Sequence, residues 1–210
     1  RWEYKNMNLL LFDFDGVLVD SLDIYEKTVT DCLNAIGQPL TRGREEFLEL
    51  FEGNFYQSLV DKGVDMKKFE EASVSILTQV NYAAMKPFDA IRPVLRRLKQ
   101  NHPLVVISSN DTPTIREALR LYDFEGIFDD ILGSDFMYSK KEKILYVIRK
   151  YSVTLQDIYY IGDTTGDIKE GKEAGVKTVG VTWGWHSKAL LAASRPDYLF
   201  DTPEDLLQLN

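Results

Sequence analysis

Residues 9–19 read LLLFDFDGVLV, an apolar run that carries two carboxylates, Asp13 and Asp15. A short run of consecutive apolar residues predicts a buried strand of a parallel sheet, and such sheets bind ligands at the carboxyl ends of their strands. Side chains two residues apart in an extended segment leave the same face. Asp13 and Asp15 could therefore bind one cation or flank one reacting atom, although solvated acids at a strand end have the same spacing.

A second apolar run, residues 104–107, ends in Ser108, Ser109 and Asn110 and is followed by a helical stretch. A hydroxyl at this strand end and the first backbone N–H groups of the helix could bind a phosphate oxygen, helped by the helix dipole. Ser108 is the first choice because it ends the apolar run, with Ser109 as the alternative. Simple capping of the helix by Asp111 or Ser109 also fits the pattern.

Two lysines and two more acids complete the set. Lys140 and Lys141 open an amphipathic stretch, and a third apolar run ends in Asp163, with Asp167 about one helical turn further on. Taken alone, the lysines would be solvated, Asp163 could cap a helix, and Asp167 could complement a helix dipole. Clustered acids need a counter-ion, however, and either lysine could supply it.

Together these segments resemble the four signature motifs of the haloacid dehalogenase superfamily, in its phosphatase branch, over residues 9–181. The matches are residues 13–19 for the DxDGTLxD form, with Val17 in place of Thr, Ser108 for the strand-end hydroxyl, Lys140 or Lys141 for the basic residue, and residues 162–167 for GDxxxD. Residues 182–186, TWGWH, resemble a turn of phosphoglycolate phosphatase-like members. Trp183 and Trp185 could equally be packing residues, and His186 is expected at the surface or as a cap.

The resemblance implies a Mg²⁺-dependent phosphatase that acts through an aspartyl phosphate. Asp13, Asp163 and the backbone carbonyl of Asp15 would bind the metal, with Asp167 bound directly or through water. Asp13 would attack phosphorus, and Asp15 would act as general acid and then as general base.

Lys140 would neutralise the remaining charge on Asp13 and on the phosphate, while Ser108 and loop N–H groups would hold the phosphate oxygens. Ser109 and Asn110 are the further expected substrate contacts on this side.

The order of predicted elements places a helical insertion in an α/β chain. Strands and helices alternate except between residues 20 and 87, where helices are expected at residues 21–36, 42–51, 55–62 and 66–84, with no convincing strand. The sequence therefore predicts a doubly wound parallel sheet, the Rossmann-like core of the superfamily, from residues 1–19 and 88–210. Residues 20–87 resemble its helical C1 cap. In this cap Gly53 and Asn54 resemble a loop that contacts the substrate, although an ordinary turn has the same composition.

The expected substrate is a small phosphate monoester such as phosphoglycolate or a sugar phosphate. A β-phosphoglucomutase-like phosphotransferase is the alternative enzyme, weakened because no Arg follows Gly53 in the loop. A non-catalytic scaffold or receiver-like module is the alternative of another class. Receivers carry the phosphorylated Asp on a later strand, whereas here the first strand carries Asp13 and Asp15.

Composition sets wider limits. The 210 residues carry a net charge of −8, which argues against a nucleic-acid partner. The single cysteine, Cys32, cannot form an intrachain disulfide. The first apolar run is too short to span a membrane. Because no charged segment followed by an apolar segment precedes residue 20, we expect no signal peptide. We expect a cytoplasmic monomer or homodimer.

Overall fold

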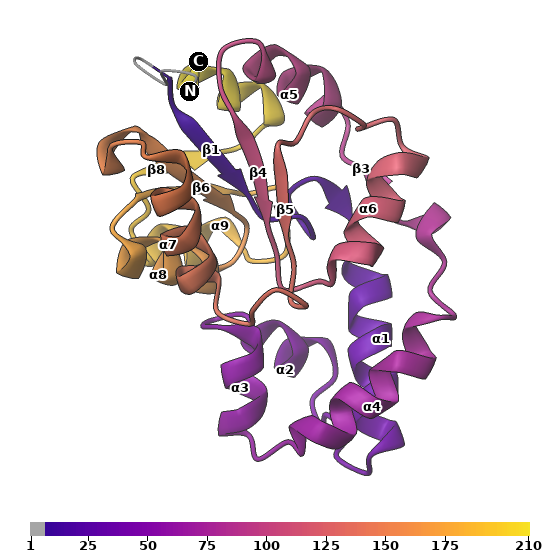
Figure 1. Cartoon of the computed structure of the whole chain (residues 1–210). Coiled ribbons are helices and arrows are strands. Elements are labelled where there is room, and N and C mark those ends of the chain that lie inside the picture. Colours follow the sequence, from indigo (N-terminus) through magenta and orange to yellow (C-terminus); the bar gives the residue numbers. More distant parts are fainter. Residues whose placement is uncertain (1–6) are drawn as a thin grey trace.

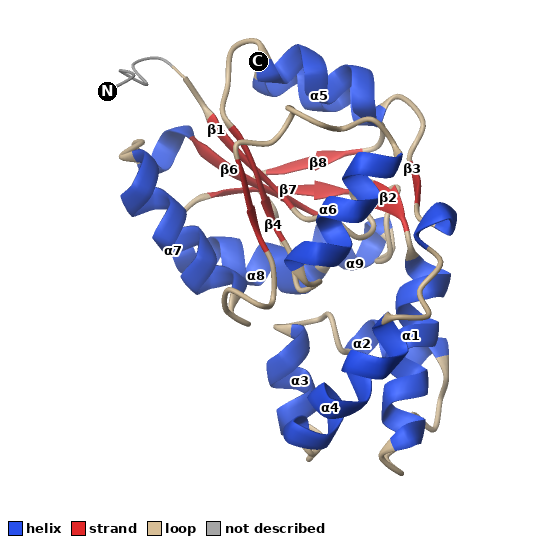
Figure 2. Ribbon diagram, turned by 45° about the vertical axis from the view of Figure 1, so that its right-hand side comes forward, coloured by secondary structure: helices blue, strands red, loops and turns tan. Residues whose placement is uncertain are grey.

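A six-stranded parallel sheet forms the centre of the computed structural model, which describes residues 7–210 (Figure 2). Its strand order is β5-β4-β1-β6-β7-β8. The strands are β1 (Leu9–Phe12), β4 (Leu104–Ile107), β5 (Asp130–Leu132), β6 (Ile158–Gly162), β7 (Lys177–Val181) and β8 (Tyr198–Phe200). Phe12, the last residue of β1, pairs with Val106 on one side and Ile161 on the other. The carboxyl ends of these three neighbouring strands therefore meet at one edge, where the strand order reverses.

Helices cover both faces of this sheet. They are α5 (Ile91–Lys99), α6 (Thr112–Leu121), α7 (Lys140–Tyr151), α8 (Thr165–Ala174) and the short α9 (Lys188–Ala193). Leu10 and Phe12 pack in one apolar cluster with residues of α5 and α6, whereas Leu9 and Leu11 pack in a second cluster with residues of α7 and α8. Side chains alternate between the two faces of a strand, so a fully apolar β1 fits a sheet that is covered on both sides. The predicted doubly wound sheet is confirmed.

Four helices lie together beyond the carboxyl edge of the sheet and form a region that we call the helical region (Figure 1). They are α1 (Leu22–Ala35), α2 (Arg44–Glu49), α3 (Phe55–Asp61) and α4 (Met66–Leu77). The region has its own apolar cluster, which includes Leu33, Phe47 and Leu59. It also includes Trp185 from the loop after β7, so this cluster joins the helical region to the rest of the chain. No helix among residues 7–210 is long and apolar enough to cross a membrane.

The structure corrects the sequence-based elements in two places. The expected helix 66–84 ends at Leu77, and a separate 3₁₀-helix, Tyr82–Ala84, follows after Asn81, whose side chain accepts a hydrogen bond from the Ala83 N–H at 3.2 Å. Residues 20–87 were expected to contain no strand, yet β2 (Val19–Asp20) pairs antiparallel with β3 (Lys86–Pro87). A ladder of two residues is too short to leave a periodic pattern in the sequence.

Three short elements near the end of the chain were not predicted either. They are α9 and the 3₁₀-helices Leu155–Asp157 and Pro203–Leu209. Each spans less than two turns of α-helix, so each offers few positions for a helical period.

The helical region contacts the start of α8 closely through backbone atoms. The Gly166 N–H donates a hydrogen bond to the Phe51 carbonyl oxygen at 2.9 Å. A Cβ atom at Gly166 would lie 2.2 Å from the Gly53 carbonyl oxygen and 2.6 Å from that of Phe51, so only glycine allows this approach. On the other side of the contact, a Cβ atom at Gly53 would meet no atom within 4 Å.

This asymmetry gives a prediction for stability. Gly166→Ala should lower the free energy of unfolding by about 1–3 kcal/mol, because the added methyl group must push the backbone of residues 51–53 away. Gly53→Ala, its matched control on the other side of the same contact, should change that free energy by less than about 0.5 kcal/mol. Urea unfolding of both variants checks this; equal stability of Gly166→Ala and wild type would show that the close contact is not maintained in solution.

Candidate active site

The carboxyl end of β1 carries the first two acids. Asp13 follows β1 directly. Its backbone N–H donates a hydrogen bond to the Ile161 carbonyl oxygen of β6 at 2.9 Å, which fixes the position of Asp13. Asp13 and Asp15 are both buried. Gly16 then turns the chain with a φ of 76°, and a Cβ atom there would lie 2.0 Å from Asp163 Oδ2. This close approach explains why glycine follows Asp15 at the strand end.

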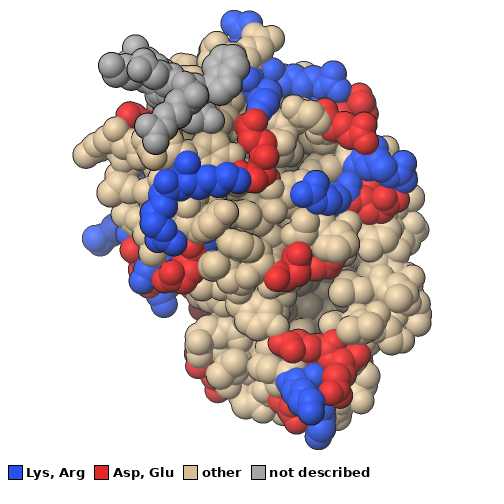
Figure 3. All heavy atoms as spheres, viewed as in Figure 1, with Lys and Arg blue, Asp and Glu red and all other residues tan. Residues whose placement is uncertain are grey.

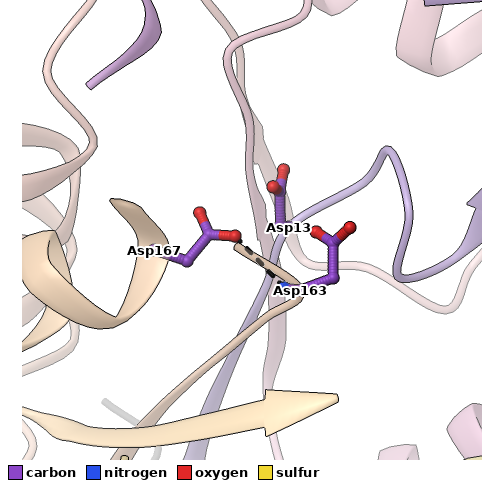
Figure 4. A group of neighbouring side chains, drawn as sticks. All are labelled: Asp13, Asp163 and Asp167. Atoms are coloured by element: carbon purple, nitrogen blue, oxygen red, sulfur yellow. Dashed lines mark hydrogen bonds between the residues drawn. The ribbon is translucent and has the colours of Figure 1, made fainter. Parts of the chain in front are cut away.

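Three carboxylates from two parts of the sequence meet at this edge. Asp13, Asp163 and Asp167 each offer an oxygen within 4.8 Å of the others (Figure 4). Asp163 follows β6, and Asp167 lies in the first turn of α8, where it forms a capping box with Thr164. All three acids are buried, so their mutual repulsion is only weakly screened.

Asp163 is the least compensated of these acids. Its Oδ2 accepts a hydrogen bond from the Trp185 N–H at 2.7 Å, but its buried Oδ1 has no partner among the described residues. Burial, reinforced by the charges of Asp167 and Asp13, raises the pKa of Asp163 well above its usual value. An unpartnered buried carboxylate oxygen beside two further acids is the arrangement that a hard cation would satisfy, so these residues fit a Mg²⁺ site.

Asp167 has a different environment, because both of its oxygens are already used. Oδ1 accepts from Lys140 Nζ at 2.7 Å and from the Tyr160 hydroxyl at 3.0 Å, while Oδ2 accepts from the Thr164 hydroxyl at 2.9 Å. Burial alone would raise its pKa, but the Lys140 ammonium and these hydrogen bonds hold the pKa of Asp167 below its usual value. Asp167 is therefore better placed to orient Lys140 than to bind a metal directly.

The structure resolves which lysine faces the acids. Lys140 Nζ lies 2.7 Å from Asp13 Oδ2 and 2.7 Å from Asp167 Oδ1, and Lys140 is buried, whereas Lys141 is only partly buried. The two carboxylates outweigh the effect of burial and raise the pKa of Lys140 well above its usual value. Burial, partly opposed by Lys140, raises the pKa of Asp13 to about 7.

Asp15 faces a separate set of donors. Its Oδ1 accepts from the Ser21 hydroxyl at 2.5 Å, and its Oδ2 accepts from Asn110 Nδ2 at 3.1 Å. Burial raises the pKa of Asp15 to about 6 in spite of these bonds. A carboxyl group with a pKa near neutrality can both give and take a proton, as a general acid and base must.

The hydroxyls after β4 also lie at this edge. Ser108 and Ser109 both line the small cleft above Asp13, Asp15 and Lys140. The helix that follows is capped by Asp111, whose carboxylate accepts from the Thr114 N–H at 3.0 Å, so neither serine is needed as the cap.

The loop at Gly53 and Asn54 lies elsewhere. Neither residue lines the small cleft above Asp13; both line a separate groove together with residues of α3, α7 and α8. Asn54 Nδ2 instead donates to the Tyr138 carbonyl oxygen at 3.1 Å and to Glu170 Oε1 at 3.1 Å, which links the helical region to α8 and to the segment before α7.

His186 also makes such a link and is buried, whereas the sequence analysis allowed a surface position. Its Nδ1 accepts from the Thr165 N–H at 3.0 Å at the start of α8, whose N-cap residue is Thr164. Its Nε2 lies 3.0 Å from the Leu48 carbonyl oxygen, in hydrogen-bond contact with the helical region.

Sequence reasoning missed Lys143. This lysine is completely buried, and its Nζ donates to the backbone carbonyl oxygens of Ser108 and Gly133, which ties α7 to the ends of β4 and β5. Burial, reinforced by the nearby charge of Lys140, lowers the pKa of Lys143 to about 7. Its position three residues after Lys140 places both lysines on one helix face, which is the one sequence signal that could have found it.

The buried Lys143 predicts a pH-dependent stability. An unfolded lysine has a pKa of about 10.4, so between about pH 7 and pH 10 the unfolded chain binds more protons than the folded one, and stability rises with pH. Replacing Lys143 by Met should remove this contribution. The slope of unfolding free energy against pH should then fall by up to about 1 kcal/mol per pH unit relative to wild type.

Urea unfolding across this pH range, with Lys141→Met as the matched control, checks the slope. Identical slopes for wild type and Lys143→Met would contradict the buried position of this ammonium group.

Comparison with known proteins places this geometry in a family. The family model described as haloacid dehalogenase-like hydrolase matches residues 10–181. The phosphoglycolate phosphatase of Synechococcus elongatus is 26% identical over 208 residues, covering 96% of this chain and 96% of that protein. The phosphoglycolate phosphatase of Aquifex aeolicus is 29% identical over 213 residues, covering 97% and 96%.

Solved structures share the fold. A predicted phosphatase from Clostridium acetobutylicum superposes with a TM-score of 0.83 at 23% identity, covering 96% of this chain and 97% of that one. A haloacid dehalogenase-like hydrolase from Bacteroides fragilis superposes with a TM-score of 0.81 at 24% identity, covering 96% and 100%. The resemblance of the sequence motifs is thus confirmed over most of the chain, and the protein is an enzyme that belongs to the haloacid dehalogenase-like hydrolases.

Proposed function

We propose that this chain is a Mg²⁺-dependent phosphatase that hydrolyses a small phosphate monoester through an aspartyl phosphate on Asp13. One observation carries the proposal: Lys140 Nζ lies 2.7 Å from both Asp13 and Asp167, beside the unpartnered Oδ1 of Asp163. The Lys140 ammonium favours the charged form of the Asp13 carboxylate, which burial among other acids disfavours. The arrangement also leaves one oxygen, Oδ1 of Asp163, free to bind a cation.

Asp13 and Asp15 divide the chemistry. Asp13 attacks phosphorus, so that a bond from its carboxylate oxygen to phosphorus forms while the bond from phosphorus to the leaving oxygen breaks. Asp15 gives its proton to that leaving oxygen. It then takes a proton from the water molecule that attacks the phosphoaspartate, which releases inorganic phosphate and restores Asp13. The raised pKa of Asp15, about 6, suits both steps.

The remaining residues offset charge. Asp13, Asp163 and the carbonyl of Asp15 would bind Mg²⁺, with Asp167 reached through water, and the ion would offset the charge of the phosphate among these acids. Lys140 offsets the negative charge of the acids and the phosphate that remains. Ser108 and Ser109, which line the cleft, would donate hydrogen bonds to the phosphate oxygens.

We further propose that residues 20–87 act as a cap that moves to admit substrate, over a core made of residues 1–19 and 88–210; residues 1–6 lie outside the described part. The cleft above Asp13 has a volume of about 10 Å³, room for roughly one water molecule. A phosphate ester needs more space, so the helical region must shift before the ester reaches Asp13. The names of the relatives make phosphoglycolate the first substrate to test. A sugar phosphate, the other substrate expected from the sequence motifs, is the second.

Replacement of the nucleophile tests the reaction. With Mg²⁺, the wild-type protein should hydrolyse para-nitrophenyl phosphate, and Asp13→Asn should lose this activity by about 10³-fold or more, because an amide cannot form the covalent intermediate. Asp89→Asn, an exposed control before α5, should keep full activity. Circular dichroism checks that both variants fold. Turnover by a folded Asp13→Asn near the wild-type rate would remove Asp13 from this role.

Metal binding should also stabilise the fold. A ligand present at a hundredfold excess over its Kd stabilises the native state by about 2.7 kcal/mol, which for a chain of this size corresponds to a rise in Tm of about 5–10 °C. Asp163→Asn should abolish most of that rise. Without Mg²⁺ this variant should melt above wild type, because one repelling carboxylate is gone.

Thermal melts with Mg²⁺ and without it, at matched ionic strength, give both comparisons, and Asp89→Asn again serves as control. An undiminished Mg²⁺ response in Asp163→Asn would exclude Asp163 from the metal site.

A further inference from the structure

A second, larger cavity adjoins the catalytic cleft between the helical region and the carboxyl edge of the sheet. It has a volume of about 210 Å³. Tyr25 and Ser109 line both the cleft and this cavity, and Asn110, which donates to Asp15 Oδ2 at 3.1 Å, lines the cavity as well. If Asp15 protonates the leaving oxygen, as the proposed function requires, the leaving group lies in this cavity.

The cavity has the size and the walls to hold a ring. An apolar cavity of about 150 Å³ is enough to bind benzene, so this one can hold a six-membered ring with small substituents. Most of its walls are apolar or aromatic side chains, such as Val29, Phe55, Phe69 and Met85. Apolar walls of this kind favour a ligand that removes apolar surface from water.

One aromatic wall is fixed in place. The Tyr56 hydroxyl donates to the Ser109 carbonyl oxygen at 2.9 Å, and its ring stacks on Tyr138 with ring centroids 4.0 Å apart. Both tyrosines line the cavity, so they present a rigid surface beside the catalytic edge.

The charges around the cavity all have one sign. Glu70, Asp111 and Asp135 line it, and among residues 7–210 no Lys, Arg or His does. Within residues 7–210 none of these three carboxylates forms a salt bridge.

Their hydrogen bonds come from uncharged donors instead. The Tyr138 hydroxyl donates to Glu70, the Thr114 hydroxyl to Asp111 at 2.6 Å, and the Thr112 N–H to Asp135 at 2.7 Å. In Figure 3 the surface is hollowed where the helical region meets the rest of the molecule, and acidic side chains lie on both sides of that hollow.

We propose that this cavity selects phosphate monoesters whose leaving group contains a ring and carries no second negative charge, so that neutral and cationic ring-bearing leaving groups are preferred. A leaving group with a carboxylate or a second phosphate would approach three carboxylates and find no cationic partner. The proposal rests on the proposed function and narrows it: a neutral or cationic ring is favoured over the carboxylate of phosphoglycolate.

A matched series of substrates tests charge and ring separately. Benzyl, para-(aminomethyl)benzyl and para-carboxybenzyl phosphate share one ring and differ in the charge of the leaving group. At low ionic strength with saturating Mg²⁺, kcat/KM for the aminomethyl ester should exceed that for the carboxy ester by about tenfold or more. Benzyl phosphate should exceed methyl phosphate by about tenfold or more, because only the benzyl group fills the cavity. Hydroxyethyl phosphate should likewise exceed phosphoglycolate.

Two neighbouring residues of α4 provide the variants. Glu70→Gln removes one charge from the cavity and keeps an oxygen that can accept from Tyr138, so it should reduce the ratio between the aminomethyl and carboxy esters about threefold or more. Glu71→Gln removes a charge from an exposed residue that does not line the cavity, and it should leave the ratio unchanged.

The outcomes separate the two proposals. One outcome is that the enzyme hydrolyses para-nitrophenyl phosphate but uses the carboxy ester as well as, or better than, the aminomethyl ester. This result would overturn the selection by charge and would not contradict the proposed phosphatase activity. Equal use of benzyl and methyl phosphate would overturn the selection of a ring. Equal effects of Glu70→Gln and Glu71→Gln would move the selectivity away from this cavity. If no phosphate ester is hydrolysed with Mg²⁺, both proposals fall.

Discussion

The ammonium group of Lys140 makes the buried acid cluster possible. At an effective dielectric constant near 20, two like charges 4 Å apart repel by about 4 kcal/mol, and the cluster places three carboxylates within 4.8 Å of one another. Lys140 compensates two of them at once, and its backbone N–H is held in turn by Glu170 Oε1 at 2.9 Å. The third acid, Asp163, has a buried oxygen without a hydrogen-bond partner, and a cation bound at this edge would satisfy it.

The same edge also supports the helical region. The helical region is linked to the core by hydrogen bonds at positions close to the acids. The Tyr56 hydroxyl donates to the Ser109 carbonyl oxygen, and the Gly166 N–H donates to the Phe51 carbonyl oxygen. Trp185, whose N–H holds Asp163, also packs against aromatic rings of the helical region, 4.9 Å from the Phe51 ring. Movement of the helical region would therefore disturb the surroundings of the acid cluster and the shape of the adjoining cavity together.

Much of the sheet edge and of the candidate site was predictable, because the sequence signals that mark a strand end are local. An apolar run that ends in an acid or a hydroxyl defines a strand end, and parallel strand ends meet at one edge, so Asp13, Ser108 and Asp163 could be placed together from the sequence. What depends on long-range packing could not be predicted. Lys143 has the pattern of a solvated lysine, and only the convergence of α7 with β4 and β5 buries it. Gly53 and the ladder between β2 and β3 likewise depend on how the helical region sits against the sheet.

Under the proposed function Asp13 carries the phosphoryl group, and direct detection of that group is the most direct test. The enzyme is mixed with substrate and Mg²⁺, quenched in acid during turnover, digested and analysed by mass spectrometry, with Asp13→Asn as control. We expect one phosphoryl group on Asp13 in the wild-type protein and none in the variant. Phosphorylation of another residue, or sustained turnover with no phosphorylated peptide at any quench time, would contradict it.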